Sequence, residues 1–194
     1  ENMKKIIIAV SLILAAGIAA MAQPKAVGLR LGATGLEASY EHNISRDQFI
    51  EANLGLDFGY NVVGNPGLKV SGVYNFVWAR PAWTTQGSWA LYAGPGITLG
   101  FVDDLVPYEI GEGIRGYHDN GFAIGVTGQV GLEYSFWFPL QLSVDLRPCI
   151  GLHINDGRFR DPYTNTIVKY GSKVGFYDNG LLGFAPTISV RYLF

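Results

Sequence analysis

A long run of strict alternation constrains this chain more than any other feature. In residues 49–61, FIEANLGLDFGYN, every second position from Ile50 to Tyr60 is apolar, and the positions between them carry charge, amide or glycine. Successive side chains of an extended strand point to opposite faces, so this pattern predicts a strand with one apolar and one polar face. The run exceeds the about 5–6 residues of an ordinary strand. It suits a strand that crosses a membrane, which needs about 9–11 residues.

The same alternation recurs along the chain. Seven further segments pair a mostly apolar face with a polar or small one: residues 27–34, 36–44, 68–78, 89–101, 122–136, 141–155 and 180–194. Bacterial membrane barrels have an even number of strands, with apolar side chains outward and polar side chains inward. We therefore predict an all-β fold, in which residues 23–194 form an eight-stranded antiparallel up-and-down transmembrane β-barrel.

Two soluble folds are the alternatives, a secreted β-sandwich and a lipocalin-like barrel. Both would bury the apolar face and turn the polar face to water. The interior of a lipocalin-like barrel is hydrophobic, whereas the predicted inner face here carries charge and glycine. A dry core built from that face would leave many polar groups unsatisfied, so the alternation favours the membrane barrel.

Residues 1–22 are predicted to be a cleavable signal peptide. Lys4 and Lys5 precede the apolar run IIIAVSLILAAGIAAMA, and the small residues Ala20 and Ala22 end it. This charge, apolar and small-residue order predicts cleavage after Ala22, which leaves Gln23 first. The alternative is a membrane-anchoring helix, because the run lies at the lower edge of a bilayer span. Export by this signal leads us to expect the bacterial outer membrane as the location.

The connector lengths predict the orientation. On the side of both termini the connectors are short: residues 45–48, 79–88 and 137–140. The other side has a tight turn near Gly35, a short loop at 62–67 and two long loops at 102–121 and 156–179. Short turns of such barrels face the periplasm and long loops face outside, so both termini are expected to be periplasmic.

The tryptophans cluster at this predicted periplasmic end. They are Trp78, Trp83, Trp89 and Trp137. Indole rings favour the membrane–water interface, so we interpret these residues as part of an aromatic girdle.

Seven charged residues are expected to point into the lumen. They are Arg30, Glu41, Glu51, Glu133, Asp145, Arg147 and Arg191. The alternation also places Glu37, Asp57 and Lys69 on inner faces. An eight-stranded barrel is just wide enough to be filled by side chains, so we interpret the seven as a structural ion network that plugs the interior. Such a network needs every member to be paired. The alternative is a gate or a narrow polar pore.

Three prolines fall inside predicted strands: Pro95, Pro148 and Pro186. Proline removes a ladder donor and normally occurs at edges or bulges. A closed barrel has no edge, so we expect a bulge at each proline, which could exchange the inner and outer faces on one side of it.

The sequence offers little for catalysis, cofactors or nucleic acid. The net charge is −2 with no basic stripe, which argues against nucleic acid as a partner. Residues 111–116, GEGIRG, match the dinucleotide-binding spacing but lack its strand and helix, so no cofactor is predicted. His153 faces inward, and His42 faces outward without a serine partner, so no nucleophile and base pair arises and no enzyme activity is expected. Around His118 the acidic residues have no ligand spacing, and no metal site is predicted.

The last residues of the chain are similar in sequence to those of a known class of proteins. In ISVRYLF, Tyr192 and Phe194 share one face of the last strand. A terminal Phe with an aromatic residue two positions earlier resembles the C-terminal signal of bacterial outer-membrane barrels. Residues 138–148, FPLQLSVDLRP, are similar to a turn and strand in such barrels of Bacteroidota. The mature chain as a whole resembles the small eight-stranded barrels related to OmpX and the OmpA membrane domain.

The resemblance implies partners and a range of functions. It implies that the barrel assembly machinery recognises Tyr192 and Phe194, and that a monomeric barrel contacts outer-membrane lipid and lipopolysaccharide. The group includes structural barrels, adhesion and host-interaction proteins, and a few lipid A-modifying enzymes. We expect a structural or surface-interaction role through the long loops, because recognition is usually carried by loops on a rigid scaffold. A narrow channel and a lipid A-modifying enzyme are the alternatives.

Overall fold

The computed structural model of the chain describes residues 25–59, 66–110, 113–155, 157–160, 166–169, 171 and 173–194. The predicted signal peptide, residues 1–22, lies outside them. Among the described residues, no helix is long and apolar enough to span a bilayer.

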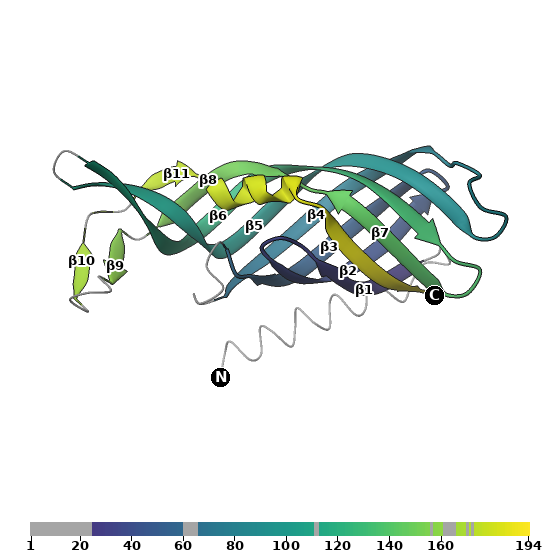
Figure 1. Ribbon diagram of the computed structural model, residues 1–194, viewed down its shortest axis with the longest axis horizontal. Helices are drawn as coiled ribbons and strands as arrows, with labels where there is room; N and C mark the ends of the chain where they lie inside the picture. The colour runs from purple at the N-terminus through teal and green to yellow at the C-terminus, as the bar shows by residue number, and fades with distance from the viewer. Residues whose placement is uncertain are drawn as a thin grey trace.

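The described residues form a closed, all-β antiparallel barrel with eight strand positions (Figure 1). The first six positions are β1 (Lys25–Leu31), β2 (Gly35–Ser45), β3 (Gln48–Asp57), β4 (Gly67–Ala79), β5 (Ser88–Ile110) and β6 (Gly113–Ser135). The predicted eight-stranded antiparallel barrel is confirmed.

The last two positions are each built from two short strands. The seventh consists of β7 (Leu140–Leu146) and β8 (Cys149–Asn155), both paired with β6. The eighth consists of β11 (Val174–Phe176), which pairs with β8, and β12 (Thr187–Leu193). Because β12 pairs with β7 on one side and with β1 on the other, it closes the barrel.

The two ends of the barrel differ. One end, called here the turn end, carries the β2–β3, β4–β5 and β6–β7 connectors and the C-terminus (Figure 1). From the opposite end, called the arm end, β5 and β6 project as a long hairpin, beside the small hairpin of β9 (Arg158–Arg160) and β10 (Ile167–Lys169). A 3-10 helix, η1 (Asp178–Phe184), lies between β11 and β12.

The alternation in β3 was predicted correctly. Ile50 and Leu54 are 40 % and 47 % exposed, whereas Glu51 and Asn53 are 0 % and 2 % exposed. The predicted end of this strand, residues 60–61, lies outside the described residues. The barrel therefore has an apolar outer face and a polar interior, the reverse of a water-soluble barrel.

The expected loop at 102–121 is wrong. The ladder between β5 and β6 continues in one register from Ser88↔Ser135 to Ile110↔Gly113. Backbone pairing between two strands needs no apolar face, so the hairpin continues beyond the residues whose alternation was diagnostic. The expected loop at 156–179 likewise contains β9, β10 and β11.

The expected bulges at Pro95 and Pro148 are also wrong. Pro95 lies opposite Gly128 in an unbroken β5–β6 register. On either side of Pro148, the pairs Thr127↔Cys149 and Val130↔Leu146 keep the same register with β6. A lost ladder bond costs about 1 kcal/mol, whereas a one-residue shift would turn every following charge to the apolar side. The register shifts instead near the turn end, in the β2–β3 ladder at Asn43/Ser45 and in the β4–β5 ladder at Val77/Ala79.

The last strand is shorter than predicted. Pro186 directly precedes β12, and residues predicted to begin the strand belong to η1 instead. The Asp104 carboxylate of β5 accepts hydrogen bonds from the N–H groups of Asp178 and Asn179, at 2.9 and 3.0 Å. These bonds satisfy the start of η1 and hold it against β5 at the arm end.

Candidate functional site

The charged interior of the barrel is the candidate site. The strands bring all seven predicted lumen residues inside, each at most 8 % exposed: Arg30, Glu41, Glu51, Glu133, Asp145, Arg147 and Arg191. Charges buried to this degree are stable only when they are paired or hydrogen-bonded, so the partners of each one decide what the interior can do.

Glu51 lies at the centre of these contacts. Its Oε1 is 3.1 Å from Arg30 Nη1, and its Oε2 is 3.0 Å from Arg191 Nη2. Gln129 Nε2 donates to Oε2 at 3.0 Å, and Asn53 Nδ2 donates to Oε1 at 2.9 Å. One carboxylate thus joins two guanidinium groups and two amides from four different strands, and Arg147 Nη1 is a more distant third cation at 3.9 Å from Oε1.

Arg30 and Arg191 extend the network to the closing strands. Arg30 also pairs with Asp145 and donates to Thr187 Oγ1 at 2.5 Å, so it joins β1 to β7 and β12. Arg191 donates to Ser39 and Ser143 Oγ at 2.9 and 3.0 Å. These contacts fill the middle of the lumen from wall to wall.

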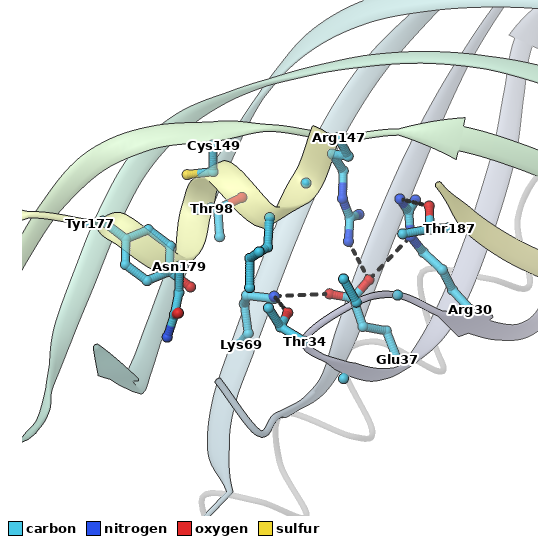
Figure 2. Close-up of a pocket in the computed structure, with 16 residues that line it drawn as sticks. Arg30, Thr34, Glu37, Lys69, Thr98, Arg147, Cys149, Tyr177, Asn179 and Thr187 are labelled. Atoms are coloured by element: carbon cyan, nitrogen blue, oxygen red, sulfur yellow. Dashed lines mark hydrogen bonds and ion pairs between the residues drawn. The ribbon is translucent and has the colours of Figure 1, made fainter. Parts of the chain in front are cut away.

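Toward the arm end, a second group of charges surrounds a cavity of about 50 Å³ (Figure 2). Arg147 pairs with Glu37, whose other carboxylate oxygen is 4.0 Å from Lys69 Nζ. Lys69 Nζ is 2.5 Å from Asp57 Oδ2 and donates to Thr34 Oγ1 at 3.2 Å. Glu37, Asp57 and Lys69 were missing from the predicted network, although the alternation already placed them inside.

The arm end of the lumen is closed by Tyr177, which directly precedes η1, and by Asn179 within η1. Tyr177 and Asn179 are each 2 % exposed, and Asn179 Nδ2 donates to the Asp103 carbonyl at 2.5 Å. Tyr177 packs in a small apolar cluster with Val102. Sequence reasoning missed this closure because residues 177–179 looked like a loop followed by a strand.

The turn end holds a larger cavity of about 390 Å³. Glu41, Glu133 and Gln141 line it from three strands, together with the Phe49 ring. Glu133 is the one predicted network residue for which no ion pair occurs among the described residues. Its Oε1 accepts a hydrogen bond from Ser135 Oγ at 3.4 Å.

The four predicted girdle tryptophans lie at the turn end. Trp78, Trp83 and Trp137 are more than 60 % exposed. Trp89 contacts Trp83 and Tyr134, with ring centroids 5.3 and 4.6 Å apart. The result is a continuous group of exposed aromatic rings across the β4–β5 and β6–β7 connectors.

The two residues of the predicted assembly signal lie beside these rings on the outer face. Tyr192 and Phe194 are 56 % and 55 % exposed. The main chain of Phe194 donates to and accepts from Lys25 at 2.8 and 3.0 Å. The last residue is therefore held by the first strand, and its ring remains on the surface.

The other residues considered for catalysis, cofactor binding or metal binding do not form such a site among the described residues. A ring nitrogen of His153, which is 2 % exposed, lies 3.1 Å from the Val102 carbonyl. In the GEGIRG segment, residues 111–112 lie outside the described residues and 113–116 belong to β6, so no helix follows the motif there. Within the described part of the chain, no group of three or more metal-binding side chains occurs.

No protein-family model, curated protein or solved structure matches the chain. Function therefore has to be inferred from the barrel itself. Its two distinctive properties are an apolar outer face and an interior crossed by ion pairs.

Proposed function

We propose that this protein is a small outer-membrane β-barrel with a structural or surface-interaction role and a filled, non-conducting interior. The observation that carries the proposal is the apolar outer face of a closed barrel. Large apolar side chains more than 45 % exposed occur on strands around the wall, for example Leu29, Leu54, Val70, Ile97, Val126, Val190. Soluble monomers rarely expose apolar patches beyond a few hundred Å², because contact between apolar surface and water is unfavourable. Contact with lipid avoids this unfavourable free energy.

The dimensions of the wall support a bilayer span. β3 contains 10 residues. At about 3.3 Å per residue and a tilt of about 40°, such a strand rises about 25 Å, which matches the apolar band of outer-membrane barrels. The aromatic rings at the turn end then lie at one membrane interface.

The orientation follows from the ends of the barrel. Short connectors and the C-terminus at the turn end support a periplasmic position, and the β5–β6 hairpin then projects from the cell. Export through residues 1–22 and assembly through Tyr192 and Phe194 belong to the same proposal. A rigid projecting hairpin is well suited to contacts with molecules outside the cell.

The interior supports a plug in place of a pore. Glu51 bridges two guanidinium groups across the middle of the lumen, and Tyr177 and Asn179 close the arm end. Opening a path would require separating buried charges, which is strongly unfavourable. The outer face gives no support to a lipid-modifying enzyme. Among the described residues, His42 is the histidine on that face, and no outward-facing serine lies beside it to form a catalytic pair.

Reconstitution tests the proposal. Protein without residues 1–22 should enter lipid vesicles from urea, gain a heat-modifiable folded form and show no discrete conductance steps in planar bilayers. A folded monomer that stays in detergent-free buffer and leaves the vesicles unoccupied would overturn the membrane assignment. Discrete conductance steps would overturn the filled interior in favour of the narrow channel.

A further inference from the structure

We propose that the turn-end cavity binds a primary ammonium group carried on a short aliphatic chain. The cavity has a volume of about 390 Å³. Sites for small organic molecules have volumes of about 300–1,000 Å³ and combine apolar walls with a few placed polar groups. The cavity lies at the turn end of the predicted ion network, and the inference does not depend on which membrane holds the barrel.

The cavity has unsatisfied acceptors. Within the described residues, no hydrogen-bond donor reaches Glu41 Oε2, Glu133 Oε2 or Gln141 Oε1. The three residues are 2 %, 8 % and 1 % exposed, so these oxygens are shielded from bulk water. Buried polar atoms without partners are uncommon, and each such atom calls for a ligand or water that satisfies it.

The two carboxylates of the cavity are incompletely paired, although Arg46 and Arg80 also line it. Among the described residues, the ion pairs of the lumen join four cations to five carboxylates. Glu133 takes part in none of these pairs. Glu41 has only Arg191, whose Nη1 is 3.7 Å from Glu41 Oε2 and whose other contacts include Glu51. A cationic guest is therefore favoured over an anionic or neutral one.

The lining selects an ammonium group over a bare metal ion. An –NH3⁺ group has three donors, which equals the number of unpartnered oxygens. The described residues provide no cluster of three metal-binding side chains. Phe49, Val77 and Ala90 also line the cavity, and they offer contact to methylene groups. A hydrated metal ion would gain nothing from these apolar walls.

The rim leaves the cavity accessible. Arg46 and Arg80 lie at its edge. Arg80 Nε is 3.4 Å from Asp47 Oδ1, and Arg80 Nη2 donates to the Arg46 carbonyl. The β2–β3 turn therefore holds the Arg80 guanidinium, and no ion pair among the described residues joins it to a carboxylate of the cavity.

The test uses the folded barrel in detergent micelles at constant ionic strength. n-Butylammonium chloride is titrated and its binding is followed by NMR, with 1-butanol as the uncharged probe and calcium chloride as the metal probe. We expect binding of n-butylammonium and none of 1-butanol at the same concentrations. Cross-relaxation between the butyl methylenes and the Phe49 ring should locate the probe in the wild-type protein, independently of any variant.

Three variants test the oxygen atoms. Glu133→Gln keeps the side-chain shape and breaks no ion pair, and it should weaken n-butylammonium binding at least about tenfold. Glu41→Gln should act in the same direction. Asp178→Asn is the control, because it makes the same charge change in η1, at the opposite end of the barrel. Its affinity should stay within about twofold of the wild type.

The outcomes separate the possible guests. Equal binding of 1-butanol, unchanged affinity in both glutamate variants, no cross-relaxation with Phe49, or calcium binding that excludes the amine would each overturn the proposal. A parallel titration with Nα-acetyl-lysine N-methylamide distinguishes two sources of the ammonium group, a lysine side chain and a free amine. Tighter binding of this compound than of n-butylammonium would assign the site to a lysine side chain of another protein, and the opposite order would assign it to free amines.

Discussion

Leu54→Arg distinguishes a barrel in lipid from a barrel in water. Leu54 points outward from β3, is 47 % exposed, and lies between Ala38 of β2 and Val70 of β4. It is six residues from Gln48, where β3 begins. Six residues of about 3.3 Å, tilted by about 40°, place it about 15 Å from the turn end, which is the middle of a hydrocarbon layer of about 30 Å.

At that depth the arginine should lower the free energy of unfolding by about 2–4 kcal/mol. In water, the same change at a half-exposed position would alter it by no more than about 0.5 kcal/mol. Ile50→Arg is the matched control, since it lies on the same face of β3, is 40 % exposed and is only two residues from Gln48. Near the interface its cost should be about 0–1 kcal/mol.

The assay is a urea titration of both variants and the wild type in lipid vesicles, with the folded fraction read from heat-modifiable mobility. The reasoning predicts a large loss for Leu54→Arg and a small one for Ile50→Arg. Equal small losses would refute the bilayer position of β3. Equal large losses would show that both positions are packed against protein.

Three further predictions concern the interior, the chain end and processing. Glu51→Ala should lower the free energy of unfolding by about 3–5 kcal/mol, because it leaves two guanidinium groups buried without their shared carboxylate; a loss below about 1 kcal/mol in the same urea titration would show that water replaces the carboxylate. Phe194→Ser should reduce the folded, heat-modifiable protein in outer-membrane fractions, whereas Ile167→Ser, at an exposed apolar side chain of β10, should not; equal folded levels would remove Phe194 as an assembly determinant. Mass analysis of the protein purified from the outer membrane should find Gln23 as the first residue, and retained Lys4 and Lys5 would instead indicate an anchored chain.

The architecture was largely readable from the sequence, because period-two alternation is a local property of an extended backbone. The alternation within a strand identifies its apolar and polar faces, as in β3 from Ile50 to Asp57. The number and length of such alternating runs predicted the barrel. The strand predictions were wrong where backbone pairing with a neighbouring strand, and not the local residue pattern, decided the structure. At Pro95 and Pro148 the register held without a bulge, and beyond Phe101 the β5–β6 ladder continued where the alternation no longer carried information.

The ion pairs and the closed arm end were decided by the tertiary structure. Alternation placed Arg30 and Asp145 on inner faces, but they are 115 positions apart in the chain and meet only because β12 joins β1 to β7. The same closure gave Arg191 its serine partners and left Glu133 without an ion pair among the described residues. A side chain's face depends on its own strand, whereas its partner depends on the order and stagger of all eight, and that order exists only once the barrel has closed.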